Sequence, residues 1–262
     1  MSRARAVALV LGCALGLVAG SAATGAEGGP ARALAAASGV HGAQAVVAAG
    51  RSGVAFDDPL LPGQWYVART HVFDAWPVLP PLAPVRVAVI DSGIDLGHPD
   101  FAGRVVASRS FVGGSARDTQ GHGTIVAGIV GARSGNGIGI AGLAPSVELL
   151  VAKVVAPDRS ISVRAEARAI RWAVDNGARV INMSLGGLRD PLVPSRDDYS
   201  SVEAEAIRYA VRKGVLVVAA VGNADQAPRE PWPFAAYPAA LPHVLGVSAT
   251  HAVTTSSGVR PQ

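Results

Sequence analysis

The amino-acid sequence predicts an α/β fold in which a doubly wound parallel sheet carries helices on both faces. Strand-like runs such as Val215–Val221 are apolar at every position instead of alternating, which is typical of strands covered on both sides. Segments of about a dozen residues with helical patterning separate these runs, as in βαβ units. With 262 residues, 50% of them hydrophobic and 16% charged, the chain can build one such domain with a sizeable core.

The first half of the domain begins where a group of prolines ends. These are Pro77, Pro80, Pro81 and Pro84. Because prolines interrupt regular structure, they place the start of the first strand at Val85, and its apolar run ends at Ile90. Small and apolar residues from His122 through Gly131 indicate a tightly packed helix, and Val147–Val155 is the second strand-like run.

The second half shows clear helix boundaries. Ser162 is a suitable N-cap for a helix that ends just before Gly177, a residue well suited to the C′ position. A further helix begins at Ser200 or Ser201 and ends at Gly214. The remaining strand-like runs are Ala178–Met183, Val215–Val221 and Val244–Ser248.

The N-terminus has the pattern of a secretory signal peptide over residues 1–26. Arg3 and Arg5 form a positive region, Ala6–Ala19 is apolar, and small residues follow. A membrane anchor is an alternative, but the apolar run is shorter than the roughly 20 residues that a spanning helix needs. Acylation at Cys13, the only cysteine, is another alternative. We expect a secreted, extracellular protein that has no membrane contact after signal removal.

Composition divides the rest of the chain and excludes some partners. We expect a linker or short pro-segment at 27–57, one domain at 58–249 and a tail of different character at 250–262. The net charge is +4, but the arginines are scattered and no basic run interleaves with aromatics, so we expect no nucleic-acid partner. Without a cysteine after the leader, the mature chain relies on its core, or on a metal, instead of disulfides.

Three polar residues lie where a parallel sheet places its function, at the carboxyl ends of strands. Asp91 follows the first strand, His122 opens a helix between two glycines, and Asn223 follows the strand Val215–Val221. Taken singly, each is more readily explained by a local turn. Together they could form a carboxylate, an imidazole and an amide around one crevice.

The segments around these residues resemble the motifs of subtilisin-like serine proteases. Residues 87–101 resemble the aspartate motif, 121–129 the histidine motif, 182–187 the substrate-binding strand and 219–223 the oxyanion segment. The pairs Gln64-Trp65 and Ala75-Trp76 resemble the entry region of that family. The motifs occur in the family's order over roughly residues 58–249.

The resemblance implies a role for each residue in the hydrolysis of a polypeptide substrate. His122 would be the general base, and Asp91 would orient its ring and stabilise the imidazolium. Asn223 would donate a hydrogen bond to the tetrahedral oxyanion. The backbone of three residues would pair with an extended substrate: Ser184, Leu185 and Gly186.

The resemblance also implies a structural calcium ion, although the chemistry needs no cofactor. The implied oxygen donors are Gln64, Asp100, Asn136 and the carbonyls of Ile138 and Ile140. The alternative for this segment is a solvated glycine-rich turn. Residues 137–142 also satisfy the dinucleotide-binding pattern GxGxxG, but they follow a helix and precede a strand, which is the wrong context.

The family's nucleophile lies in a Gly-Thr-Ser-x-Ala segment, and this sequence contains none. After Asn223 the serines are Ser248, Ser256 and Ser257, and none of them has that context. The favoured interpretation is a subtilisin-like endopeptidase whose given chain is truncated, so the C-terminal part of the fold is missing and its own activity is doubtful. Two alternatives are a secreted, non-catalytic peptide-binding module and one half of a split protease completed by a second fragment.

Overall fold

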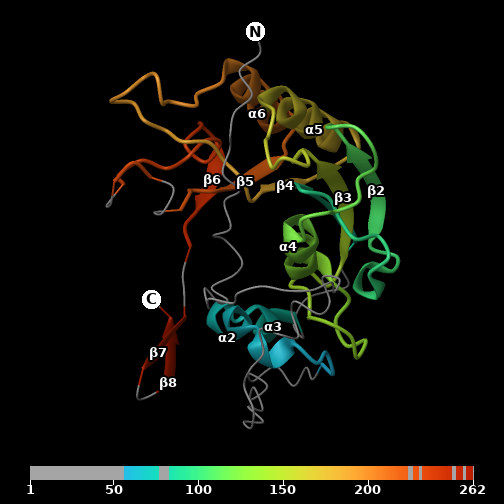
Figure 1. Cartoon of the computed structure of the whole chain (residues 1–262). Coiled ribbons are helices and arrows are strands. Elements are labelled where there is room, and N and C mark those ends of the chain that lie inside the picture. The colour runs from blue at the N-terminus through green and yellow to red at the C-terminus, as the bar shows by residue number, and fades with distance from the viewer. Residues whose placement is uncertain are drawn as a thin grey trace.

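A computed structural model describes residues 56–76, 83–223, 227–229, 232–249, 252–255 and 258–261. Its centre is a six-stranded sheet with the order β2-β3-β1-β4-β5-β6, in which every neighbouring pair is parallel (Figure 1). The strands are β1 (Val85–Asp91), β2 (Val105–Ser110), β3 (Val147–Lys153), β4 (Val180–Met183), β5 (Leu216–Ala220) and β6 (Val244–Val247).

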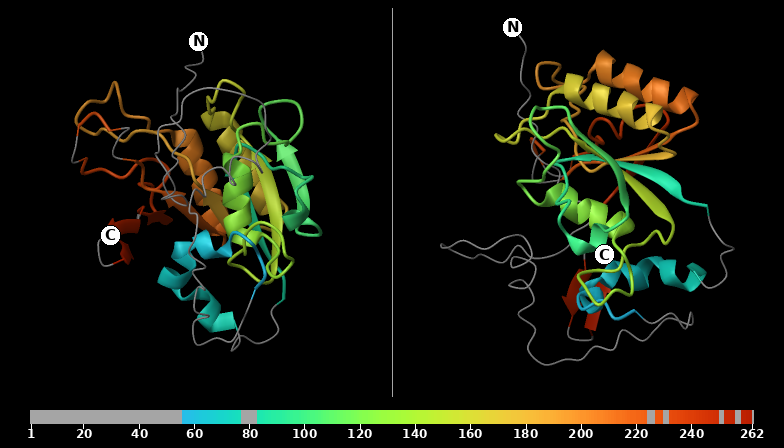
Figure 2. Two further views of the ribbon diagram at one scale, coloured as in Figure 1. Left: turned by 60° about the horizontal axis from the view of Figure 1, so that its bottom comes forward. Right: turned by 90° about the vertical axis from the view of Figure 1, so that its right-hand side faces the viewer.

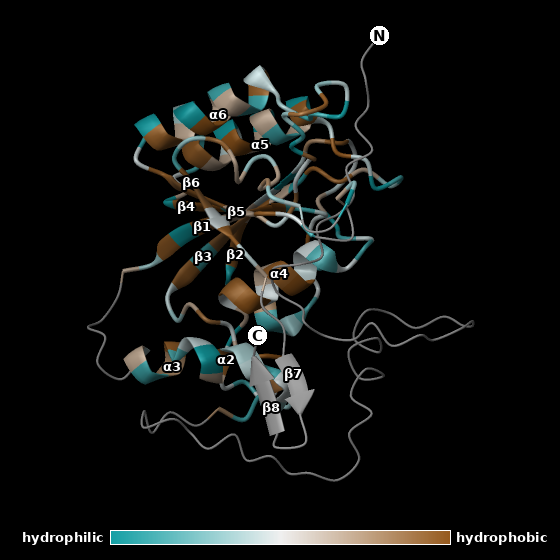
Figure 3. Ribbon diagram, turned by 90° about the vertical axis from the view of Figure 1, so that its left-hand side faces the viewer, coloured by the Kyte–Doolittle hydropathy of each residue, from teal (hydrophilic) through white to brown (hydrophobic). Residues whose placement is uncertain are grey.

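Helices cover both faces of this sheet, as predicted. Helices α5 (Val163–Asp175) and α6 (Ser201–Arg212) lie together on one face, and α4 (His122–Gly131) lies on the other (Figure 3). Alternate residues of β1 reach the two sides, because Ala88 and Ile90 pack with the α5/α6 core whereas Val89 packs in the cluster under α4. This double burial explains why the strand sequences are almost continuously apolar.

The strand order reverses beside β1. The chain passes from β1 out to β2, returns through β3 on one side of β1, and then continues to β4 on the other side. Since all six strands are parallel, their carboxyl ends share one edge of the sheet. A reversal of this kind opens a crevice at the carboxyl end of the central strand, which here is Asp91.

Short helices near the N-terminus pack against the loop that joins α4 to β3 (Figure 2). They are η1 (Leu61–Gly63), α2 (Trp65–Thr70) and α3 (Val72–Ala75); another short helix, η3 (Pro99–Phe101), follows β1. Val67 and Phe73 form a small core with Ala141 of the loop. The GxGxxG segment at 137–142 lies within this loop, which agrees with its exclusion as a dinucleotide site.

Most predicted elements are confirmed within one or two residues. The predicted strand Val85–Ile90 is β1, and Ser162 and Ser200 are the N-caps of α5 and α6. Sequence reasoning missed α2, α3 and β2. Strand β2 lies at the edge of the sheet with alternating exposure, so it lacks the apolar run that marks the central strands.

The predicted boundaries are partly outside the described residues. The signal peptide 1–26 and all of 27–57 except its last two residues lie outside them. Within the predicted tail 250–262, β7 (Ala252–Thr255) and β8 (Gly258–Pro261) form an antiparallel pair. Among the described helices, none is long and apolar enough to cross a membrane.

Candidate active site

Asp91 and His122 form a buried hydrogen-bonded pair at the carboxyl edge of the sheet. Asp91 is the last residue of β1, and His122 is the first residue of α4. Nδ1 of His122 lies 2.7 Å from Oδ1 of Asp91, and their side chains are 8% and 0% exposed. Because this contact holds the proton on Nδ1, it leaves Nε2 able to accept a proton from a neighbouring hydroxyl.

Two glycines permit the close approach that forms this pair. A Cβ added at Gly123 would lie 2.3 Å from the carbonyl oxygen of Gly93 and 3.2 Å from Cβ of Asp91. Gly93 itself has φ +113°, and a Cβ there would lie 2.4 Å from the carbonyl oxygen of Ala116. The first turn of α4 thus packs directly on the backbone after Asp91, and only glycine fits at either position.

The surroundings of His122 favour its protonated form. Burial by itself favours the neutral ring, but the hydrogen bond and charge of Asp91 and the charge of Asp118 outweigh it, so the pKa of His122 is raised above its usual value. A base of raised pKa takes a proton more readily. The site can therefore stabilise an imidazolium during proton transfer.

The predicted substrate-binding residues, Ser184 to Gly186, directly follow β4, the neighbour of β1. Leu185 is fully buried and Ser184 is 6% exposed, with its hydroxyl accepting a bond from Asn182 (3.0 Å). All three residues, Gly186 included, are therefore buried as whole residues, backbone as well as side chain. The next residue, Gly187, exchanges two backbone hydrogen bonds with Tyr237 (2.8 and 2.9 Å).

Asn223 lies at the same edge, three residues beyond β5, and it is half-buried. Gly222 before it has φ +109°, a conformation that turns the chain sharply at this point. Because β4 alone separates β5 from β1, the ends of these two strands are roughly 10 Å apart. The structure thus places Asn223 on the same rim as Asp91, although no hydrogen bond joins the two.

Three functional candidates near the pair were missed by sequence reasoning: Ser92, Asp118 and Lys153. Asp118 accepts hydrogen bonds from the first turn of α4, and Ser92 links it to that turn. Lys153, only 6% exposed, donates to the carbonyl oxygens of Ser92 (2.7 Å) and Arg117 (3.0 Å). Two features of the sequence could have indicated them: Asp118 stands just before the start of a helix, and Lys153 stands among buried apolar residues of a strand.

The five predicted calcium ligands gather where the loop after α4 meets α2 and η3. Asp100 is 2% exposed, and its Oδ1 accepts a bond from Nδ2 of Asn136 (3.0 Å). Its Oδ2 lies 3.4 Å from the backbone nitrogen of Ile140, and Oε1 of Gln64 accepts from Ala141 (2.8 Å). Ile138 donates its backbone N–H to Oδ1 of Asn136 (3.0 Å).

This group fits a hard cation in the kind and placement of its donors. Asp100 is a buried carboxylate that only N–H groups contact, apart from a histidine ring 3.9 Å away, so a cation would compensate its charge. To bind the cation, the amide oxygens of Gln64 and Asn136 would have to turn away from the backbone N–H groups that they now accept from, those of Ala141 and Ile138. No cluster of three or more His, Cys, Asp or Glu suited to a metal occurs among the described residues, so an ion here would need amide and carbonyl oxygens beside the carboxylate of Asp100.

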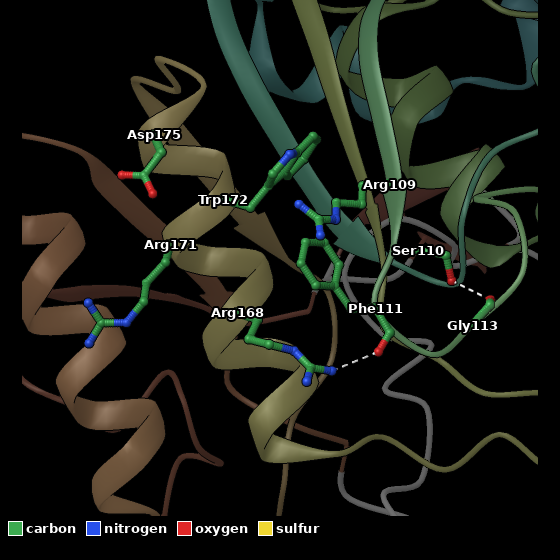
Figure 4. A pocket seen from close by; sticks show the side chains of 8 residues that line it. All are labelled: Arg109, Ser110, Phe111, Gly113, Arg168, Arg171, Trp172 and Asp175. Carbon is green, nitrogen blue, oxygen red and sulfur yellow. Dashed lines mark hydrogen bonds between the residues drawn. The ribbon is translucent and has the colours of Figure 1, made fainter.

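A separate pocket of about 490 Å³ lies between the end of β2 and α5 (Figure 4). Arg168 donates to the carbonyl oxygen of Phe111 (3.0 Å), and Arg109 stacks over the ring of Phe111. Arg171 lies over the ring of Tyr209, whose hydroxyl donates to Asp175 (2.6 Å). None of the predicted site residues lines this pocket, and its charged groups are already engaged within the protein.

The geometry agrees with a match to known proteins. A family model described as the subtilase family matches residues 83–261, which includes most of the segment 250–262.

Individual relatives are similar over the same part of the chain. Thermitase of Thermoactinomyces vulgaris is 38% identical over 168 residues, 63% of this chain and 54% of the relative. Subtilisin Savinase of Lederbergia lenta is 40% identical over 168 residues, 63% of this chain and 55% of the relative. A thermophilic serine proteinase of Bacillus sp. (strain AK1) is 36% identical over 162 residues, which are 61% of this chain and 38% of the relative. The chain thus spans about half the length of such relatives or less.

Proposed function

Because the chain belongs to the subtilase family, we propose that it supplies the base, the orienting acid and the oxyanion donor of a secreted serine endopeptidase. His122 acts as the general base, Asp91 orients it, and Asn223 donates to the tetrahedral oxyanion. The observation that carries this proposal is the buried contact of 2.7 Å between Nδ1 of His122 and Oδ1 of Asp91. The sequence has no Gly-Thr-Ser-x-Ala segment, and we propose that further polypeptide supplies the nucleophile.

We propose a polypeptide substrate bound in extended form along the backbone of Ser184, Leu185 and Gly186. Their place directly after β4, at the edge of the sheet that carries Asp91, supports this proposal. A substrate strand at this place would run between the ends of β1 and β5, and so between His122 and Asn223. Its scissile carbonyl would then lie within reach of both the base and the oxyanion donor.

The surface of β6 supports the need for a further segment. Leu245 is 53% exposed and Val247 is 38% exposed on β6, which lies at one edge of the sheet. Exposed apolar side chains that lie together mark a surface that another segment can cover. A segment that brings the serine would also cover these side chains.

The proposed function is tested by supplying that segment. Residues 27–262 are expressed alone and fused to a subtilase C-terminal segment that carries Gly-Thr-Ser-x-Ala, and the release of product from a chromogenic peptide is followed. The fusion is expected to hydrolyse the peptide, whereas the chain alone is expected to be no faster than its His122→Ala variant. A fusion with alanine in place of the serine is the matched control. Equal rates for the fusion and its alanine control, both folded, would contradict the proposal.

We propose that calcium binds at Asp100 and stabilises the fold, and calcium is therefore expected to raise the free energy of unfolding. At a concentration of 100 times the dissociation constant, the gain is about 2.7 kcal/mol, because calcium binds only the folded chain. Asp100→Asn removes the buried carboxylate and is expected to abolish the gain. Urea unfolding with calcium or with a chelator measures it, and Asp175→Asn on α5 is the control. A gain that persists in Asp100→Asn places the ion elsewhere.

A further inference from the structure

We propose that Asp118 is a positioning residue for His122, because its carboxylate holds the first turn of α4 to the turn that follows Asp91. The inference rests on the proposed role of His122 as the general base, and it adds a residue to which no role has been assigned. Asp118 lies in the loop before α4, four residues before His122. It touches neither His122 nor Asp91 by hydrogen bond, so it acts through the backbone and the electrostatic field around them.

The carboxylate of Asp118 accepts five hydrogen bonds. Oδ1 accepts from the hydroxyl of Ser92 (3.0 Å) and from the backbone nitrogens of Gln120 and Gly121 (both 2.9 Å). Oδ2 accepts from the backbone nitrogen (2.9 Å) and the hydroxyl (2.7 Å) of Thr124. A helix leaves its first N–H groups without partners, and the N-cap Gly121 has no side chain to accept them. Asp118 performs this capping from outside the helix.

Ser92 extends the connection to the catalytic aspartate. Its hydroxyl accepts from the backbone nitrogen of Gly123 (2.9 Å) while it donates to Asp118, so it is held from both sides. The backbone nitrogen of Ser92 donates to Oδ1 of Asp91 (2.7 Å), the same oxygen that contacts His122. Ser92 is therefore bound by both aspartates, by Asp91 through its backbone nitrogen and by Asp118 through its hydroxyl. A shift of Asp118 would move Ser92, and with it the oxygen of Asp91 that contacts His122.

Charge in this region also favours the role. The buried ammonium of Lys153 donates to the carbonyl oxygen of Ser92, and the charge of Asp118 raises the pKa of Lys153 against the larger, lowering effect of burial. Burial disfavours protonation of His122, and the charges of Asp91 and Asp118 both favour it, with the net result that the pKa of His122 is raised. Burial also opposes ionisation of Asp118, but its hydrogen bonds outweigh this, and its pKa is lowered, so the carboxylate is charged at neutral pH.

The test compares Asp118→Asn with wild type in the full chain, by NMR titration of the His122 ring. Asparagine keeps the shape and one acceptor oxygen but removes the charge. The pKa of His122 is expected to fall, because one of the negative charges that raise it is removed. Amide hydrogen exchange at Gly121 and Thr124 is expected to accelerate. Asp175→Asn, an exposed aspartate on α5, is the matched control and should change neither. An unchanged pKa of His122 in folded Asp118→Asn would overturn the inference.

A second variant keeps the inference testable if Asp118→Asn does not fold. Ser92→Ala removes the hydroxyl link alone, and is expected to accelerate amide exchange at Gly123 and to shift the Nδ1–H resonance of His122. If neither changes, Asp118 does not act through this segment.

The titration does not depend on catalysis, so it separates this inference from the proposed function. In the serine-bearing fusion, Asp118→Asn is expected to lower kcat about 10- to 100-fold with little change in KM, because the base is misplaced. An inactive fusion with a normal NMR result would contradict only the proposed function. Full activity of the Asp118→Asn fusion would overturn the inference.

Discussion

Replacing Asp91 with asparagine is expected to lower kcat of the serine-bearing fusion by about 10⁴-fold, the size known for the orienting aspartate of serine proteases. Oδ1 of Asp91 accepts from both His122 and the backbone nitrogen of Ser92. An asparagine that kept this oxygen in place would carry no charge. It would therefore no longer stabilise the imidazolium that forms when His122 takes the serine proton.

Steady-state hydrolysis of the chromogenic peptide measures this loss. KM is expected to change little, because Asp91 is fully buried and does not reach a substrate. Asp175→Asn makes the same chemical change on an exposed helix and should leave kcat unaltered. A loss of less than about tenfold in Asp91→Asn would show that the buried pair does not orient the base.

Replacing Gly123 with alanine is expected to destabilise the chain by about 3 kcal/mol, at the upper end of the range for overpacking a tight contact. The added Cβ would lie 2.3 Å from the carbonyl oxygen and 3.0 Å from the backbone nitrogen of Gly93. Both are backbone atoms that cannot move aside as a side chain can. Helix α4 must therefore shift away from β1, which lengthens the contact between His122 and Asp91.

Urea unfolding measures the loss, and the NMR signal of the His122 Nδ1–H reports the contact. Gly63→Ala is the matched control, because a Cβ at Gly63 meets nothing within 4 Å and its backbone is not in the left-handed region. That variant should stay within about 0.5 kcal/mol of wild type. If Gly123→Ala changed the free energy of unfolding as little as Gly63→Ala, the conclusion that α4 packs closely on the turn after Asp91 would be wrong.

Burial on both faces is the reason that so much of the fold could be predicted. The run Val147–Val155 is largely apolar because β3 faces two cores, and Ser200 marks the start of α6 because its hydroxyl accepts from the backbone nitrogen of Glu203 (3.4 Å). The same reasoning fails for β2, where Arg109 is exposed and no apolar run stands out. Strand β2 is recognised only once its pairing with β3 is known.

Some residues of the candidate site could likewise be predicted from the sequence, and others could not. Asp91 could be predicted because it follows a predicted strand, and His122 because it opens a predicted helix between two glycines; the structure brings the two into contact. The structure places Asn223 on the same rim, but its role stays a prediction. Asp118 could not be assigned, because its significance depends on contacts with Ser92 and Thr124, which are 26 residues before it and six after it.

Labelling with a fluorophosphonate tests most directly whether His122 and Asp91 activate a serine. The probe reacts with a serine hydroxyl only when a neighbouring base removes its proton, so it reports the chemistry without a substrate. The serine-bearing fusion is expected to be labelled at that serine, and the label is expected to be lost in both His122→Ala and Asp91→Asn. Labelling that proceeds equally fast in His122→Ala would contradict the account, because the hydroxyl would then react without the base that this chain is proposed to supply.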